Sequence, residues 1–173
     1  MTLVATTTAW SLLDTPVGPL LLTTDGAALT AVYFERHRDG SDRRPAAAQR
    51  PGTRDDDHPV LLAARTQLGE YFARERREFD LPLAPVGTAF QQRVWAALLA
   101  IPYGETASYG DVARRLGLLP SASRAVGLAN GSNPISIIVP CHRVIGADGS
   151  LTGYGGGLDR KRYLLDLEAD LLF

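Results

Sequence analysis

The stretch ISIIVPCHRVIG at residues 135–146 is the part of the sequence that decides the fold of the second half of the chain. Its first five residues, 135–139, form a β-branched apolar run, which predicts a short buried strand. The sequence Pro-Cys-His-Arg at 140–143 follows at once. Neighbouring positive charge lowers the pKa of a thiol, and the thiolate is the nucleophile, so this placement suits a reactive cysteine. The alternative is that Cys141 only packs in the core, and these residues leave both readings open.

The adjacency of Cys141 and His142 argues against a protease-type dyad, because neighbouring residues of an extended chain point to opposite sides. A bridging water relieves this geometry, and a carboxylate can then orient His142. The candidate carboxylates lie in or near a last helix, and they are Asp159, Asp166 and Glu168. Their spacing does not choose among them, and each is otherwise an exposed helix carboxylate.

Helical spacing predicts three helices before this stretch, at about 88–100, 108–116 and 122–129. The last two are short and are joined by a tight Gly-containing turn, which outlines a helix-turn-helix. A hairpin predicted over 144–152 and a helix over 158–167 complete a winged-helix outline of the α+β class. Arg124 lies early in the second helix of the pair, where such domains meet DNA, although a solvated arginine is the alternative.

The first half of the chain reads as a separate α/β domain over residues 1–84. Apolar segments and turn residues up to Phe34 predict hairpins. Residues 36–59 lack periodicity and predict a mobile surface loop. A helix is expected over 60–73, a strand over 79–83 and a linker over 81–87. The second domain then covers 88–173.

The composition is that of an ordinary globular protein and excludes several kinds of site. The 173 residues are 45% hydrophobic and 21% charged, and a net charge of −1 gives no basic excess that would point to nucleic acid. The single cysteine rules out an intramolecular disulfide, and with only three histidines we expect no metal and no cofactor. The absence of a long apolar run and of a signal-peptide pattern predicts a cytoplasmic protein with no membrane partner.

A glycine cluster, Gly-Tyr-Gly-Gly-Gly at 153–157, lies just before the last helix. Leu158 replaces the last glycine of a dinucleotide-binding pattern, and the Lys-Ser/Thr ending of a phosphate loop is absent. The cluster therefore predicts either a close approach of the backbone to a ligand or to the cysteine loop, or a plain turn.

Together these pieces resemble the O6-alkylguanine-DNA alkyltransferase family. The motifs that carry the resemblance are FQQRVW at 90–95, IPYGET at 101–106, SYG at 108–110, RAVG at 124–127, NG at 130–131, NP at 133–134, IVPCHRVIG at 138–146 and GYGGGL at 153–158, followed by Lys161 and Glu168. The match covers about residues 88–168, and the first domain matches more loosely. The resemblance implies an RNase H-like first domain and a suicide repair reaction on DNA.

The resemblance also implies roles for individual residues. The catalytic group is Cys141 as alkyl acceptor, His142 as base through a water, Glu168 to orient His142, Asn133 to hold the turn before the cysteine, and Tyr109 to donate a proton to the purine. The guanine pocket takes Ser136, Val144, Tyr154 and Gly155. Arg124, flanked by Ser123 and Ala125, fills the gap left by the flipped base. The partner is double-stranded DNA with O6-alkylguanine or O4-alkylthymine, bound through its minor groove by a monomer that can assemble cooperatively.

Two departures and three rival functions accompany this resemblance. Ser136 stands where some members carry proline beside the alkyl pocket, and the loop at 116–121 varies in length within the family. The rivals are a noncatalytic alkyltransferase-like DNA binder, a winged-helix transcription factor and a cysteine hydrolase. The presence of Cys141 argues against the first, the Pro-Cys-His-Arg and glycine motifs against the second, and the adjacency of Cys141 and His142 against the third.

Overall fold

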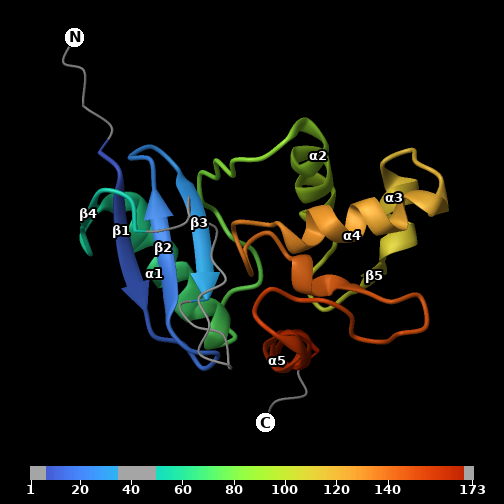
Figure 1. The fold of residues 1–173 in the computed structure, drawn as a ribbon. Coiled ribbons are helices and arrows are strands. Elements are labelled where there is room, and N and C mark those ends of the chain that lie inside the picture. The colour runs from blue at the N-terminus through green and yellow to red at the C-terminus, as the bar shows by residue number, and fades with distance from the viewer. Residues whose placement is uncertain (1–6, 35–49, 170–173) are drawn as a thin grey trace. The chain divides into compact units, whose positions relative to one another are not determined.

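The computed structural model describes residues 7–34 and 50–169, which form two compact units, Met1–Pro85 and Val86–Phe173. Each unit has its own sheet and its own core (Figure 1). The division falls within the linker that the sequence places at 81–87. Among the described residues, no helix is both long enough and apolar enough to cross a membrane.

The described residues of the first unit, 7–34 and 50–85, form a four-stranded sheet with one helix packed against it (Figure 1). Its elements are β1 (Ala9–Leu13), β2 (Leu20–Thr24), β3 (Leu29–Phe34), β4 (Thr53–Arg54) and α1 (Pro59–Phe72). The strand order is β3-β2-β1-β4, with antiparallel pairing from β1 to β3 and a parallel pair between β1 and β4. All five residues of β2 are buried, as expected for a central strand covered by a helix.

The helix α1 covers this sheet with a stripe of buried side chains at helical spacing: Leu61, Ala64, Leu68 and Tyr71. The His58 side chain caps its first turn by accepting a hydrogen bond from the Val60 N–H at 3.2 Å. The helical spacing of apolar residues in the sequence therefore accounts both for the helix and for the face that it buries.

Two predictions for the first unit are wrong in part. The loop expected over 36–59 contains β4 at Thr53–Arg54, and residues 35–49 of it lie outside the described part. The strand expected over 79–83 is reduced to one parallel bridge between Leu29 and Leu83. Both errors concern pairing with a distant strand, which local composition does not encode.

The second unit is mainly helical. It begins with α2 (Ala89–Leu98), β5 (Ala107–Ser108), α3 (Tyr109–Arg115), the short 3-10 turn η2 (Pro120–Ala122) and α4 (Ser123–Gly131). It ends with the 3-10 turn η3 (Cys141–Arg143), β6 (Val144–Ile145) and α5 (Leu158–Glu168). The helices α3 and α4 pack together across η2, and they form the predicted helix-turn-helix (Figure 1).

Local capping explains where the helices of the second unit begin. Reciprocal side-chain and backbone hydrogen bonds join Thr88 to Gln91 before α2, and Ser108 to Asp111 before α3. Each of these capping boxes satisfies two backbone donors of a first turn. The Trp95 indole N–H also donates to the Ala129 carbonyl at 2.8 Å, which joins α2 to the end of α4.

The strand predicted at 135–139 and the hairpin predicted at 144–152 do not form. A series of buried turns replaces the strand, and Ile137 takes a left-handed backbone conformation, with φ of 72°. The turn expected near Gly149 is present, with the Gly146 N–H donating to the Ser150 carbonyl at 2.9 Å. However, β6 pairs in parallel with β5 instead of with its own return strand.

Candidate active site

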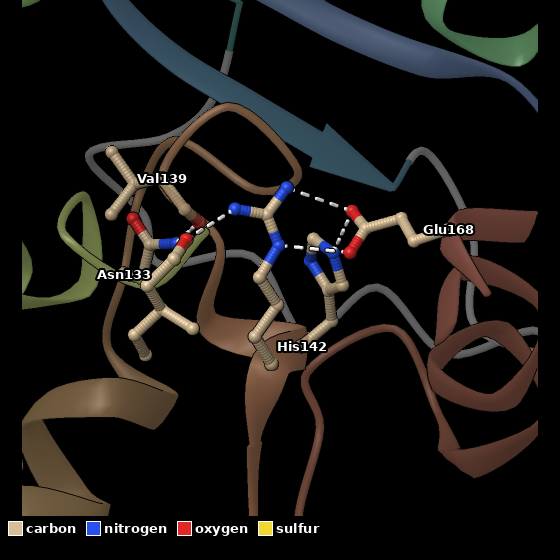
Figure 2. A network of polar contacts seen from close by, with 6 residues as sticks. Asn133, Val139, His142 and Glu168 are labelled. Carbon is tan, nitrogen blue, oxygen red and sulfur yellow. Dashed lines mark hydrogen bonds and ion pairs between the residues drawn. The ribbon is translucent and has the colours of Figure 1, made fainter. Parts of the chain in front are cut away.

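The side chain of Asn133 organises the turns that lead to Cys141. Its Nδ2 donates to the carbonyls of Val139 at 2.8 Å and Ile135 at 3.3 Å, and its Oδ1 accepts from the Ile135 N–H at 3.0 Å. Figure 2 shows Asn133 beside Val139, with Glu168 and His142 facing each other nearby. Because one buried amide satisfies three backbone groups, residues 133–139 are held without a strand ladder. This explains why a run with strand composition is not a strand.

The nucleophile candidate Cys141 begins the 3-10 turn η3 and is 5% exposed. Its carbonyl accepts a hydrogen bond from Asn130 Nδ2 at 3.3 Å. Burial raises the pKa of the Cys141 thiol, and a hydrogen bond from the Asn133 side chain and the charge of Lys161 act in the opposite direction. The expectation that the adjacent basic residues lower this pKa is therefore wrong, because the desolvation of a buried thiolate outweighs the nearby charge.

The residues that follow Cys141 are tied to Glu168 at the end of α5. His142 Nε2 lies 2.7 Å from Glu168 Oε1. Arg143 donates from Nε to Oε2 at 2.8 Å and from Nη2 to Oε1 at 3.0 Å, and from Nη1 to the Ile101 carbonyl at 2.6 Å. Of the three candidate carboxylates, Glu168 is the one that contacts His142, while Asp159 is exposed and Asp166 is half-buried.

The charge state of Glu168 determines which ring nitrogen of His142 carries the proton. Burial alone raises the pKa of Glu168, but the hydrogen bonds and charges of His142 and Arg143 outweigh burial and lower the pKa to about 2. An ionised carboxylate only accepts hydrogen bonds, so His142 Nε2 carries the hydrogen that lies between them. Burial lowers the pKa of His142, against the pull of Glu168, so the ring is neutral near pH 7.

In that neutral tautomer the other nitrogen, Nδ1, holds a lone pair. His142 Nδ1 is buried and makes no hydrogen bond with the described residues. A buried acceptor without a donor is costly, and such atoms mark positions where a water or a reacting group binds. Nδ1 is thus the basic atom that His142 offers at this site, one residue from the Cys141 thiol.

Lys161 of α5 is fully buried and lies between two backbone carbonyls of the site. Its ammonium donates to the carbonyls of Val144 at 2.5 Å and Thr152 at 2.9 Å. Burial lowers the pKa of Lys161, while the negative charge of an ionised Cys141 raises it. The Tyr109 hydroxyl, at the start of α3, donates to the same Thr152 carbonyl at 3.1 Å. The Thr152 carbonyl thus links α3 to α5.

The remaining residues expected at the guanine pocket are spread over the segments around Cys141. Ser136 is 9% exposed within the turns before it, and Val144 begins β6. The ring of Tyr154 is half-buried with its hydroxyl inside, and burial followed by the charge of Cys141 raises the pKa of Tyr154 well above its ordinary value. Gly155 lies exposed in the glycine cluster. The effect of the Cys141 charge on the pKa of Tyr154 indicates that the glycine cluster lies near the thiol.

The residues expected to contact DNA lie at the start of α4. Arg124 and Ala125 are exposed, and Ser123 is half-exposed with its hydroxyl donating to the Pro120 carbonyl. Arg124 lines a groove of about 380 Å³ together with Tyr109, Ser123, Gly127 and Leu128. The structure therefore brings Tyr109 of the expected catalytic group and Arg124 of the expected DNA face to one surface.

Two buried polar side chains of the site, Asn130 and Lys161, were given no role by the sequence, and Arg143 was expected only as a positive charge beside the thiol. Asn130 supports the Cys141 carbonyl, Arg143 pairs with Glu168, and Lys161 lies beside the thiol. The sequence did single out Lys161, because it is the only lysine among 18 basic residues and because it follows the GYGGGL motif in the family pattern. Arg143 is part of the Pro-Cys-His-Arg motif itself.

The arrangement is suited to nucleophilic chemistry by one thiol. A buried cysteine lies next to a neutral histidine with a free lone pair, and that histidine is held by an ionised glutamate. A cation lies beside the thiol, and a tyrosine hydroxyl lies on the adjoining helix. The fold and the site define a two-domain protein whose helix-turn-helix domain carries its own nucleophile.

Comparison with known families covers almost the whole chain. The family model of the 6-O-methylguanine DNA methyltransferase ribonuclease-like domain matches residues 8–85, and that of the 6-O-methylguanine DNA methyltransferase DNA binding domain matches residues 89–170. The chain therefore belongs to the 6-O-methylguanine DNA methyltransferase family. This confirms the family, and the two-domain fold class, that the sequence motifs indicate.

Relatives and solved structures agree over the same length. A methylated-DNA--protein-cysteine methyltransferase of Mycobacterium tuberculosis is 55% identical over 157 residues, which is 90% of this chain and 89% of the relative. One from Methanosarcina acetivorans is 48% identical over 159 residues, covering 92% of this chain and 97% of the relative. The crystal structure of Mycobacterium tuberculosis OGT in complex with DNA is similar with a TM-score of 0.81 at 51% identity, covering 94% of this chain and 93% of that one.

Proposed function

We propose that this chain repairs DNA directly, by moving an alkyl group from O6-alkylguanine to Sγ of Cys141. One observation carries the proposal: the buried Cys141 lies beside a histidine–glutamate pair in the same unit as the helix-turn-helix. The names of the relatives, methylated-DNA--protein-cysteine methyltransferase, and the DNA complex of a similar protein support this chemistry and DNA as the partner.

The reaction balances without a cofactor. The S–C bond forms as the C–O6 bond breaks, and the electron pair of the C–O6 bond stays with the purine. The thiol proton leaves Cys141 through a water to His142 Nδ1, which Glu168 orients through Nε2. Tyr109 donates a proton to N3 of the purine, so that the leaving guanine does not depart as an anion. The product on Cys141 is a thioether with no hydrolysis route, so each molecule acts once.

The target base must leave the stack to reach a buried thiol. We place Arg124, flanked by Ser123 and Ala125, in the gap that the flipped base leaves. The pocket for the base consists of Ser136, Val144, Tyr154 and Gly155. With a net charge of −1, binding depends on this local face and not on a general basic surface.

Several finer features stay predictions of this proposal. They are binding through the minor groove, action as a monomer that can assemble cooperatively on DNA, repair of O4-alkylthymine, and a cytoplasmic location. The division of labour between residues 1–84 and 88–173 is also proposed, with the first domain supporting the second. A noncatalytic lesion binder is disfavoured, because such a protein needs no acceptor cysteine.

Intact-protein mass spectrometry tests the proposal. After incubation with excess duplex DNA containing O6-methylguanine, we expect every molecule to gain the mass of one CH2 unit, located on Cys141, and the reaction then to stop. Cys141→Ala is expected to bind the same duplex without any adduct. Repeated turnover, or an unmodified Cys141, would contradict the proposal, and a parallel loss of DNA binding in Cys141→Ala would indicate a structural role for the cysteine.

A further inference from the structure

The buried side chain of Asn130 has no part in the proposed reaction, although the Asn-Gly pair at 130–131 is one of the motifs of the site. Asn130 lies near the end of α4 and is 3% exposed. A polar side chain that is buried to this extent normally has partners for both its donor and its acceptor. Asn130 has a partner for the donor only, and the chemistry of the missing partner indicates what the residue binds.

The donor half of the Asn130 amide contacts the backbone of the nucleophile. Nδ2 donates to the Cys141 carbonyl at 3.3 Å. The opposite orientation of the amide would place Oδ1 against that carbonyl oxygen, and two acceptors repel each other. The contact therefore fixes which amide atom is the oxygen. Because Oδ1 and Nδ2 share one carbon atom, Oδ1 lies among the residues that surround Cys141.

The acceptor half of the amide, Oδ1, is buried and accepts no hydrogen bond from the described residues. Another such acceptor is His142 Nδ1, whose role as base accounts for it. The end of α4 is held in place, because the Trp95 indole N–H donates to the Ala129 carbonyl at 2.8 Å. A buried oxygen without a donor costs free energy, and a ligand that supplies the donor recovers it.

The proposed substrate offers one group that can donate to such an oxygen. In O6-alkylguanine the alkyl group leaves N1 without a hydrogen, N3 and N7 are acceptors, and O6 is an ether oxygen. The exocyclic 2-amino group is thus the only N–H donor of the base. Proteins that act on flipped bases read them by hydrogen bonds of this kind. O4-alkylthymine has no N–H donor, since its N3 also carries no hydrogen.

We propose that Asn130 Oδ1 accepts a hydrogen bond from the 2-amino group of the flipped O6-alkylguanine, which makes Asn130 a specificity-determining residue. The inference rests on the proposed function and deepens it. Cys141 is 5% exposed, so the segments around it must part to admit the base, and this opening also gives the base access to Oδ1. A base without the amino group leaves Oδ1 unpaired and is disfavoured. The site therefore selects alkylated guanine over alkylated hypoxanthine and thymine.

Single-turnover methyl transfer from two otherwise identical duplexes tests the proposal. One duplex contains O6-methylguanine and the other O6-methylhypoxanthine, which lacks only the 2-amino group. We expect the wild-type chain to react faster with O6-methylguanine. The ratio of the two rates should fall about 10-fold in Asn130→Leu, as expected for the loss of one hydrogen bond. Differences between the two lesions in base pairing and flipping cancel, because every chain is compared on the same two duplexes.

Two variants are matched controls for the rate ratio. Asn130→Asp keeps an acceptor at this position and should keep most of the preference for O6-methylguanine. Trp95→Phe removes the hydrogen bond to the Ala129 carbonyl and loosens the end of α4 without changing Asn130. It should slow transfer from both lesions equally. If Asn130→Leu does not fold, as judged by thermal unfolding, Asn130→Ala removes the same amide with less crowding and gives the same comparison.

The outcomes separate a contact with the base from a structural role. An unchanged rate ratio in the folded Asn130→Leu or Asn130→Ala chain would overturn the proposal, as would a wild-type chain with no preference between the lesions. An equal fall of the ratio in Trp95→Phe or in Asn130→Asp would overturn it as well, since the packing of α4 would then set the preference. If the wild-type chain takes no methyl group from either duplex, the proposed function fails instead.

Discussion

Arg143 and Glu168 form a two-pronged ion pair inside the second unit, with Nε 2.8 Å from Oε2 and Nη2 3.0 Å from Oε1. The guanidinium is 8% exposed and the carboxylate 1% exposed, so neither charge is solvated by bulk water. The planar guanidinium of Arg143 matches the two carboxylate oxygens of Glu168. It also holds Oε1 in a position where that oxygen contacts His142. The residue after the histidine thus fixes the carboxylate that orients the histidine.

Removal of Arg143 should therefore destabilise the second unit strongly. Arg143→Ala removes the guanidinium that pairs with the buried Glu168 carboxylate, and the expected loss is about 3–5 kcal/mol in the free energy of unfolding. Arg143→Lys keeps the charge without the fork and should lose less. Urea unfolding, followed by Trp95 fluorescence in a Trp10→Phe background, measures this unit alone. A loss below about 1 kcal/mol in Arg143→Ala would show that the pair is not held as described.

The same pair predicts how stability depends on acid. The pKa of Glu168 is lowered from 4.5 to about 2, so this carboxyl group ionises more readily in the native state than in the unfolded chain. Its contribution, about 3 kcal/mol, is complete above about pH 4.5 and is lost as the pH falls towards 2. Glu168→Gln should flatten this acid limb in urea titrations at each pH. An identical limb in Asp166→Asn and in Glu168→Gln would contradict the assignment to Glu168.

Much of the second unit was accessible from the sequence because its signals are local. The capping boxes at Thr88 and Ser108 each use residues three positions apart, and the predicted helices begin there. The motifs around Cys141 were enough to indicate the family. The first unit gave weaker signals, since β4 consists of two residues and pairs with a strand some forty residues earlier in the chain, with Ala9 opposite Thr53.

The errors arise where side chains replace the backbone pairing that sequence patterns describe. The run 135–139 is apolar because it is buried, but the carbonyls of Ile135 and Val139 accept hydrogen bonds from the Asn133 side chain. The pairing of Ala107 with Val144 joins segments far apart in the chain. The choice of Glu168, and the direction of the Cys141 pKa shift, depend on burial in three dimensions, which no spacing along the chain determines.

Lys161 offers a test of the electrostatics at the thiol. Its buried ammonium favours the thiolate of Cys141, so Lys161→Gln should raise the pKa of Cys141 further above its ordinary value of 9.0. Since Cys141 is the only cysteine, the difference in ultraviolet absorbance between each chain and its Cys141→Ser counterpart during a pH titration isolates the thiolate from the six tyrosines. Arg162→Gln, one residue along α5 and exposed, should leave the titration unchanged. A lower or unaltered pKa in Lys161→Gln would remove Lys161 from this role.

Tyr109 is predicted to act in the chemical step through its hydroxyl alone. Tyr109→Phe should slow alkyl transfer about 100-fold, the usual effect of losing a general acid, while duplex binding is retained because the ring still lines the groove. Single-turnover transfer and equilibrium binding on the same duplex measure the two effects. Thr152→Val removes the hydroxyl that donates to Tyr109 at 3.2 Å and serves as the control, with near wild-type transfer expected. Unchanged transfer in Tyr109→Phe would exclude the proton donation.

His142 makes the most specific prediction, because its role as base determines the shape of a pH profile. The pKa of His142 is lowered from 6.5, so its Nδ1 lone pair is available throughout pH 6.5–9, and transfer by the wild-type chain should be nearly level there. In His142→Gln no base removes the thiol proton, so only the fraction of Cys141 that is already ionised can react. Burial has raised the pKa of that thiol above 9.0, so the rate should rise about tenfold per pH unit over the same range.

Single-turnover rates with free O6-benzylguanine, which avoid the pH dependence of DNA binding, give this profile directly. Asp166→Asn, a carboxylate of α5 that does not contact His142, should keep the level wild-type profile. If His142→Gln is level as well, the thiol proton leaves by another route. If the wild-type profile already rises tenfold per unit, Cys141 reacts only as a preformed thiolate, and the histidine–glutamate pair then serves to hold η3 in place and does not remove the proton.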